Sequence, residues 1–253
     1  MEFNIKEKHV LHNAQVSGDA WVSANAQVFG DAQVSGDAWV FGDARVSGNA
    51  WVCGNAWVYG SAQVFGDAQV SGDAQVSGDA QVSGDAWVYG NAQVSGNAWV
   101  YGSAQVSGDA RVYGDTWVYG NAWVYGSAQV SGNAQVSGSA QVYGNARVSD
   151  NAWVSGNAQV SGNAQVSGNA QVSGSALIEK TSDYLVIGPA KSSGRFTTAH
   201  KDSKLGVRVN CGCFSGTVKE FSDAIEKTHK DNPEALAQYR LFCQLIVNFG
   251  VEG

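Results

Sequence analysis

The sequence predicts an all-β solenoid, a rod of stacked coils, followed by a small α+β unit. Twenty-seven consecutive copies of the hexapeptide Ala-x-Val-x-Gly-(Asp/Asn/Ser) run from Ala14 to Ser175 without an insertion. A unit this short cannot bury its own apolar side, so each copy must stack on its neighbours. Within each copy, Ala and Val alternate with mostly polar residues, which is the period-two pattern of a strand with one buried face.

The corners of the rod follow from the end of each copy, where Gly precedes Asp, Asn or Ser. These residues favour turns, so we expect strands of about four residues with a corner after each. Glycine is missing at two corners, Ala24 and Asp150, and Asn follows at both. Because Asn tolerates positive φ, we expect Asn25 and Asn151 to take the left-handed conformation there. Thr116 is the only departure from Ala at the small inward position.

The repeat resembles the hexapeptide-repeat family, whose chains wind as left-handed parallel β-helices with three hexads in each coil. This resemblance implies a triangular, left-handed rod of about nine coils. A four-sided coil is the alternative. Tryptophan stacking favours the 18-residue coil weakly, since three Trp pairs have this spacing (Trp21/Trp39, Trp39/Trp57 and Trp99/Trp117) and one has a spacing of 24 residues (Trp99/Trp123).

The chain divides into an N-terminal cap at residues 1–13, the repeat rod at residues 14–178 and a small α+β domain at residues 179–253. In this last domain we expect three short strands and then two helices. The strands are predicted at 183–190, 195–201 and 206–214; the first helix has its N-cap at Ser215 or Thr217, and the second has Pro233 in its first turn. Such a domain would cap the end of the rod, because an open solenoid end exposes strand edges.

Composition and charge narrow the class of protein. Four scattered cysteines do not form a disulfide framework, and the first ten residues hold no apolar run typical of an export signal. We therefore expect a cytoplasmic protein that does not insert into a membrane. The repeat carries eleven Asp and three Arg, a net charge of −8. Because an acidic rod repels phosphate backbones, we expect no nucleic-acid partner.

The family resemblance also raises an enzymatic alternative, because many hexapeptide-repeat proteins are acyltransferases with a catalytic His and loops that leave the coils. Here no loop interrupts the hexads, and His200 and His229 lie outside the rod. A general base must reach its substrate, so we expect no acyltransfer, no other catalysis and no cofactor.

Cys211 and Cys213 are the remaining candidates for metal or thiol chemistry. If they lie in one strand, both thiols face the same side and could bind one metal. Structural zinc sites usually have wider Cys spacings, and free Cys is commonly a small buried residue. We therefore predict that this pair holds no metal.

The candidate binding residues are the aromatic side chains that point outward. Nine Trp, seven Tyr and three Phe occupy outward positions of the rod. Exposed aromatic clusters are typical of contact surfaces, although stacked aromatics also stabilise a sheet by about 0.2 to 1 kcal/mol per cross-strand pair. One cluster lies near the N-terminus (Trp21, Trp39, Phe41, Trp57 and Tyr59). The predicted contact surface lies in the middle of the rod and spans two adjoining faces. Trp99, Tyr101, Trp117 and Tyr119 are expected on one of them, and Trp87, Tyr89, Trp123 and Tyr125 together on the next.

These features predict a non-enzymatic binding or scaffold protein that engages a protein partner through its aromatic faces. The tail resembles segments of uncharacterised bacterial and phage hexapeptide-repeat proteins, which implies an inhibitor or decoy as a narrower form. Self-assembly into trimers or filaments is the main alternative. A carbohydrate-binding rod and an ice-binding rod are further alternatives, and both fit the composition less well. If the aromatic surface is not the contact site, we expect the site in the tail at 195–214.

Overall fold

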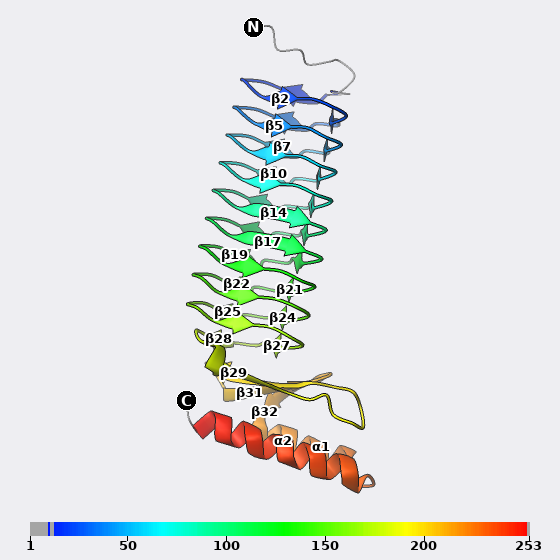
Figure 1. Cartoon of the computed structure of the whole chain (residues 1–253), viewed down its shortest axis with the longest axis vertical. Coiled ribbons are helices and arrows are strands. Elements are labelled where there is room, and N and C mark those ends of the chain that lie inside the picture. The colour runs from blue at the N-terminus through cyan, green and yellow to red at the C-terminus, as the bar shows by residue number, and fades with distance from the viewer. Residues whose placement is uncertain (1–9, 11–12, 252–253) are drawn as a thin grey trace.

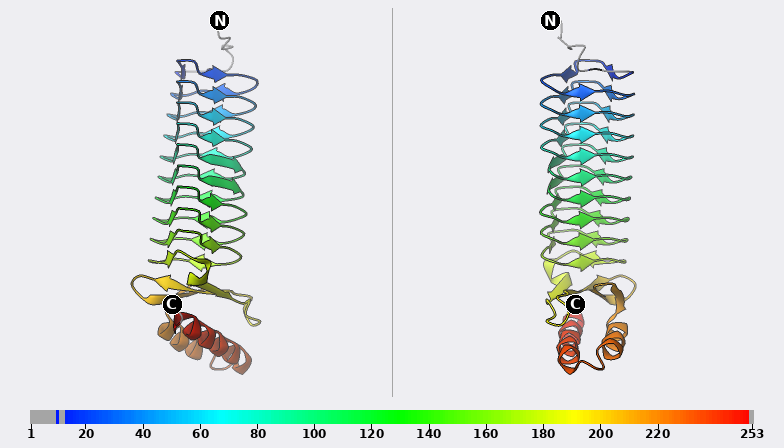
Figure 2. Two further views of the ribbon diagram at one scale, coloured as in Figure 1. Left: turned by 60° about the vertical axis from the view of Figure 1, so that its left-hand side comes forward. Right: turned by 90° about the vertical axis from the view of Figure 1, so that its right-hand side faces the viewer.

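The structure is a computed structural model that describes residue 10 and residues 13–251. The repeats form a straight rod, and the small domain lies at its C-terminal end (Figure 1). Three parallel sheets run along the rod (Figure 2), and each strand pairs with the strand three places further along the chain. Thus Gln15 pairs with Gln33, and Trp99 with Trp117. This 18-residue spacing confirms the three-sided rod of about nine coils, and the four-sided alternative is wrong.

We number the three faces in the order in which the chain enters them. Face 1 contains β1 (Gln15–Val16), β4 (Gln33–Val34), β7 (Trp51–Val52), β10 (Gln69–Val70), β13 (Trp87–Val88), β16 (Gln105–Val106), β19 (Trp123–Val124), β22 (Gln141–Val142), β25 (Gln159–Val160) and β28 (Leu177–Ile178). Face 2 contains β2 (Trp21–Val22), β5 (Trp39–Val40), β8 (Trp57–Val58), β11 (Gln75–Val76), β14 (Gln93–Gly96), β17 (Arg111–Gly114), β20 (Gln129–Val130), β23 (Arg147–Val148) and β26 (Gln165–Val166). Face 3 contains β3 (Gln27–Val28), β6 (Arg45–Val46), β9 (Gln63–Val64), β12 (Gln81–Val82), β15 (Trp99–Val100), β18 (Trp117–Val118), β21 (Gln135–Val136), β24 (Trp153–Val154) and β27 (Gln171–Val172).

The core of the rod consists of ladders of Val and Ala. From Ala26 onward both residue types are completely buried, and Val stacks on Val in register, as Val100 does on Val118. Burying a Val side chain contributes roughly 1.5 to 3 kcal/mol, so the repeated ladder supplies most of the stability of the rod. The inward positions predicted from the hexad are confirmed. Most strands span two residues rather than the expected four, because the residues on either side already bend toward the corners.

The corner glycines have a φ between 60° and 85° along the rod. A Cβ on Gly48 would lie 3.0 Å from the backbone nitrogen of Gly66 in the next coil, so a side chain at this corner would be tight and would require the neighbouring coil to shift slightly.

The two corners without glycine do not behave as expected. Ala24 and Asp150 themselves have positive φ, 59° and 58°, so the expected shift to Asn25 and Asn151 is wrong. The N–H of Asn151 still donates to the carbonyl of Gly168 at 3.0 Å, as at other corners. The regular hydrogen-bond ladder therefore keeps the left-handed conformation at the preceding residue.

The C-terminal domain packs two helices against a four-stranded antiparallel sheet. Its elements are the 3-10 helix η2 (Thr181–Asp183), β29 (Tyr184–Ile187), β30 (Thr197–Asp202), β31 (Gly206–Cys211), β32 (Phe214–Thr217), α1 (Val218–Thr228) and α2 (Pro233–Val251). The sequence predicted three strands, and it missed that the chain turns after Cys211 and begins β32 at Phe214. Thr217 is the N-cap of α1, so the second of the two predicted N-caps is confirmed.

The buried core of this domain is separate from that of the rod. It gathers residues from the sheet and from both helices, including Val209, Phe221, Tyr239 and Ile246. Among the described residues, neither helix combines the length and the apolar character needed to cross a bilayer. The N-terminal cap predicted at residues 1–13 falls almost entirely outside the described residues.

Candidate binding surface

Four of the eight predicted contact residues form a continuous aromatic patch on face 3. Trp99 and Trp117 lie on the adjacent strands β15 and β18, with ring centroids 5.6 Å apart and planes 8° apart. Tyr101 and Tyr119 stack beside them at 5.0 Å and 1°. The edge of Tyr101 also contacts Trp117 at 6.3 Å. We call these four residues the Trp99 patch.

The other four predicted residues lie on face 1 and do not form one cluster. Trp87 contacts Tyr89 edge-on at 6.5 Å, and Trp123 contacts Tyr125 in the same way at 6.1 Å. Gln105 on β16 pairs with both Trp87 and Trp123, so it separates the two pairs by one coil. The predicted division of the eight residues over two faces is confirmed, but the four on face 1 form two separate pairs, so the expectation that they lie together is wrong.

Tyr143 extends the group around Trp123, and sequence reasoning missed it. Its ring stacks on Tyr125 at 5.0 Å and 4°. The signal was available, because the two tyrosines are 18 residues apart in the sequence. We call Trp123, Tyr125 and Tyr143 the Trp123 patch.

The tyrosine side chains lean along the rod onto the next coil. The hydroxyl of Tyr89 donates to Gln105 Oε1 at 3.4 Å, and Tyr119 donates to Gln135 Oε1 at 3.5 Å. Tyr125 and Tyr143 make the same contact with Gln141 and Gln159. Burial and a stacked neighbour raise the pKa of Tyr101 and of Tyr125, so both phenols are neutral near pH 7. These tyrosines brace successive coils.

The tryptophans are more open to solvent than the tyrosines that brace the coils. Trp99 and Trp117 each keep 41% of their surface exposed in the middle of the rod. Among the described residues, neither indole N–H has a hydrogen-bond acceptor, whereas that of Trp153 donates to Ser137 Oγ at 3.2 Å. The Trp99 patch therefore presents flat apolar rings and two free donors.

The aromatic cluster predicted near the N-terminus also forms, on face 2. Trp39 stacks on Trp57 at 5.5 Å and 11°, and Phe41 stacks on Tyr59 at 5.0 Å and 3°. Trp21 contacts Trp39 at 4.8 Å with a steep angle between the rings. The rod thus carries aromatic stacks on all three faces.

Side chains of the C-terminal domain replace a further coil at the end of face 3. Within the rod, strand N–H groups donate to carbonyls of the next coil, as Trp153 does to Ala170 at 2.8 Å. At the last strand, β27, side chains of β30 accept these bonds instead. Gln171 donates to Thr198 Oγ1 at 2.9 Å, Ser173 to His200 Nε2 at 3.3 Å and Ser175 to Asp202 Oδ2 at 3.1 Å. Every second residue of β30 thus caps the exposed edge.

His200 is completely buried at the centre of this cap. Its Nδ1 lies 3.1 Å from the carbonyl of Lys201, which can only accept, so Nδ1 carries the proton. Nε2 accepts from Ser173 N–H and lies 3.0 Å from the amide nitrogen of Asn210. Burial lowers the pKa of His200 from 6.5 to about 4. Both ring nitrogens are engaged, so His200 serves the fold and is not available as a general base.

Asp202 completes the cap as a charged acceptor. Its Oδ2 accepts from Arg208 Nε at 2.8 Å as well as from Ser175. Burial alone would raise the pKa of Asp202, but hydrogen bonds from Arg208 and from three backbone N–H groups outweigh it and lower the pKa to about 2. The carboxylate is ionised throughout the physiological range.

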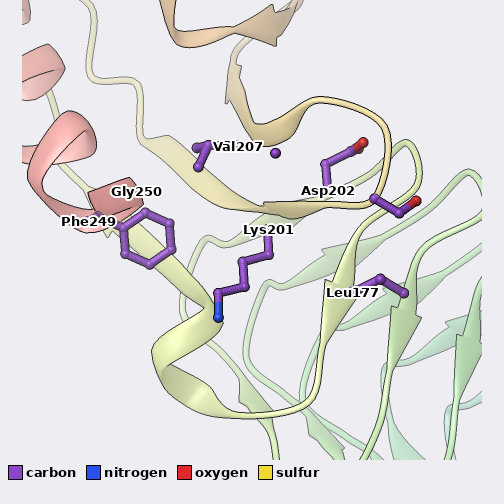
Figure 3. A pocket seen from close by; sticks show the side chains of 8 residues that line it. Leu177, Lys201, Asp202, Val207, Phe249 and Gly250 are labelled. Atoms are coloured by element: carbon purple, nitrogen blue, oxygen red, sulfur yellow. The ribbon is translucent and has the colours of Figure 1, made fainter. Parts of the chain in front are cut away.

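A pocket of about 400 Å³ lies where the rod meets the C-terminal domain. Figure 3 shows Leu177, Val207 and Phe249 around it, together with Lys201. Lys201 Nζ pairs with Asp183 Oδ1 at 3.0 Å, and Asp202 pairs with Arg208. Because both charged groups that line it already have partners, this pocket offers mainly apolar contacts.

The two cysteines do not lie in one strand, so that expectation is wrong. Cys211 ends β31 and is buried, whereas Cys213 lies in the turn and is exposed. Gly212 between them has a φ of 61°, which reverses the chain and breaks the strand alternation. Across the described ranges, no three His, Cys, Asp or Glu side chains gather in a way that could hold a metal ion.

The stacked parallel coils define a parallel β-solenoid protein. The family model of the YdcK beta solenoid repeat matches the chain along the rod, at residues 14–30, 32–48, 38–54, 44–60, 74–90, 92–106, 104–120, 118–132, 128–142, 140–156, 158–174 and 164–179. Together these segments cover more than half of the sequence, and the chain belongs to this family. A comparison with curated proteins gives no match. The family points to a scaffold-like fold.

Proposed function

We propose that this chain is a non-enzymatic scaffold that binds a protein partner, with the Trp99 patch at the centre of the contact. The observation that carries the proposal is the pair of parallel stacks, Trp99 on Trp117 and Tyr101 on Tyr119. Large aromatic side chains near the centre of an interface commonly supply 2 kcal/mol or more each. Their rigid ladder positions also reduce the entropy lost on binding.

The stacked rings would stabilise the rod even without a partner. A purely stabilising role, however, does not require indole rings that remain exposed to solvent. An aromatic pair contributes about 0.5 to 1.5 kcal/mol beyond the area that it buries. The indole N–H groups of Trp99 and Trp117 remain free for a partner, in contrast to that of Trp153. The Trp87 and Tyr89 pair and the Trp123 patch, on face 1, would extend the contact to a second face.

We further propose a narrower role for the chain and a location for the interaction. The tail resembles segments of uncharacterised bacterial and phage hexapeptide-repeat proteins, and on that resemblance we propose a phage-type inhibitor or decoy as a narrower function. All four cysteines are free thiols, which supports a cytoplasmic setting for the interaction. We propose no nucleic-acid or membrane partner, because the net charge of the repeat is −8.

We also propose that the chain is not an enzyme. His200, one of the two histidines considered as a base, has both ring nitrogens in structural hydrogen bonds. His229 stacks on Tyr239 at 4.9 Å in the C-terminal domain, away from the coils. Neither arrangement resembles an acyl-transfer site between coils.

The test replaces Trp99 and Trp117 together by Ser. Both rings point outward, so the Val and Ala ladders should remain intact and the variant should keep its circular dichroism spectrum. Quantitative affinity capture from host lysate should then show at least a tenfold loss of the specific partner, which corresponds to about 1.4 kcal/mol.

Trp153→Ser is the matched control, because Trp153 lies on the same face with 44% exposure and Gln135 separates it from Trp117. Equal capture by the wild type, the control and the double variant would contradict the proposal. Sedimentation velocity on the same proteins tests the alternative: loss of a trimer in the double variant would assign the patch to self-assembly.

A further inference from the structure

The C-terminal domain contains a second pocket, of about 410 Å³, that lies away from the rod. It opens between the β31–β32 turn, the second half of α1 and the start of α2. Phe214, Phe221, Ala224 and Ile225 form its apolar wall, and the rest of the lining is Arg195, Cys211, Cys213, Thr228, His229 and Tyr239. A volume of this size is typical of sites for small organic ligands.

The walls are aromatic and well ordered by mutual contacts. Phe214 and Phe221 lie 5.3 Å apart, and Phe221 meets Tyr239 edge-on at 6.2 Å. His229 stacks on Tyr239 at 4.9 Å with planes 15° apart. The hydroxyl of Tyr239 is bonded to Ser193 Oγ at 2.9 Å, which holds the ring in place. Phe221 and Tyr239 are almost completely buried in the core of the domain, so Phe214 and His229, which are half-buried, present the ring surface that a planar apolar body would contact.

Arg195 brings an uncompensated positive charge to the pocket. The other two arginines of the domain each hold a carboxylate: Arg208 holds Asp202, and Arg240 holds Glu226. In the part of the chain that the structure describes, no carboxylate pairs with Arg195.

The turn glycine explains where the Arg195 side chain lies. A Cβ on Gly212 would be 3.1 Å from Arg195 Cδ and 3.2 Å from Nε. The missing side chain at position 212 therefore lets the guanidinium group lie across the β31–β32 turn at the pocket.

We propose that this pocket binds a small aromatic carboxylate. The ring would pack against Phe214 and His229 at the mouth of the aromatic wall, and the carboxylate would pair with the guanidinium of Arg195. A charge-assisted Arg–carboxylate pair provides orientation and affinity, and the aromatic walls exclude strongly hydrated anions such as phosphate. The single cation matches a monoanion. This activity is separate from the aromatic surface of the rod, so either can fail without the other.

The test measures binding of 1-naphthoate to the full-length protein by calorimetry and by ligand-observed NMR. The neutral 1-naphthamide is the matched probe. We expect naphthoate to bind and naphthamide to bind at least roughly tenfold more weakly, because it lacks the charge that pairs with Arg195. Arg195→Gln should weaken naphthoate binding by a similar factor and should leave naphthamide binding unchanged.

Lys191→Gln removes one positive charge from the same loop without touching this pocket, and it should change naphthoate affinity less than about twofold. Ala224→Phe adds a ring to the pocket from α1 and should abolish binding of both probes. Circular dichroism confirms the fold of each variant. If naphthoate at a concentration of about 5 mM shows no binding, the dissociation constant is too weak for a specific site, and the proposal is overturned. Unchanged naphthoate affinity in Arg195→Gln would overturn it as well.

Discussion

Acidification should open the junction between the rod and the C-terminal domain through His200. In the folded protein, burial lowers the pKa of His200 from 6.5 to about 4. The N–H groups of Ser173 and Asn210 both point at Nε2, whose lone pair accepts from them. A proton on Nε2 would take up this lone pair and would face both donors. Neighbouring charges act in opposite directions, since Asp202 raises and Arg208 lowers the pKa.

The sign of the effect follows from the depressed pKa. Between pH 6.5 and about 4 the opened state binds a proton that the folded state does not, so stability falls as the pH falls through this window. Below about pH 4 the contribution of His200 is lost and the slope ends. The shift corresponds to about 3 kcal/mol, or roughly a hundredfold increase in the opening equilibrium between pH 7 and pH 4.

Hydrogen exchange measured by mass spectrometry on peptides that cover β27 and β30, after correction for intrinsic exchange rates, reports this opening. His200→Gln keeps an acceptor but does not titrate, so the free energy of opening in this variant should no longer depend on pH between pH 7 and pH 4. His229→Gln should retain it. Asp202 titrates in a lower window, because its pKa is about 2. A flat opening free energy from pH 7 to pH 4, or a slope that persists in His200→Gln, would refute the role of His200.

Two further predictions concern the rod and the absence of catalysis. Thr116→Val should raise the melting temperature, with a gain of about 1 kcal/mol, because Thr116 Oγ1 is buried without a hydrogen-bond partner and Val keeps the shape of the side chain. Thr116→Ser, which keeps the hydroxyl, should give no gain; a lower melting temperature of the Val variant would contradict the argument. Incubation with acetyl-CoA and candidate acceptors should release no free CoA. Release that disappears in His229→Gln would show that the chain is an acyltransferase.

Much of the rod could be predicted from the sequence because one pattern repeats. Because the copies are nearly identical, Val must point to the same side in all of them. If that side were outward, the rod would expose its entire apolar core, so the inward assignment is safe. The 18-residue coil was harder to predict, because only the spacing of a few Trp pairs favoured it over 24 residues. The expectation of left-handed winding rests on the family resemblance and not on the residues.

The failures occur where tertiary contacts override local preference. Asn25 and Asn151 are better suited to positive φ than Ala24 and Asp150, yet the corner keeps its register because the hydrogen bonds to the neighbouring coil outweigh the cost at one residue. The turn at Gly212 separated Cys211 from Cys213 for a related reason, since β32 must return along β31 to complete the sheet.

The cap could not be predicted because its side chains do not belong to the repeat. Thr198, His200 and Asp202 differ in chemistry, yet each lies 27 residues after the N–H group that it accepts from. Alternate residues of a strand have the spacing needed to match alternate N–H groups of β27. An exposed strand edge invites pairing with another chain, and these acceptors occupy that edge.

This arrangement also bears on self-assembly. A filament that grew end to end from the C-terminal end of the rod would need free N–H groups along the last edge of face 3. The three described donors there, Gln171 in β27 and Ser173 and Ser175 after it, already have side-chain partners. The exposed aromatic faces remain open along the side of the rod, where Trp99 and Trp117 keep 41% of their surface. If the chain binds a partner or a second copy, as proposed above, the exposed rings along the side of the rod would supply the contact in either case. For this reason the double substitution of Trp99 and Trp117 must be followed by both partner capture and sedimentation.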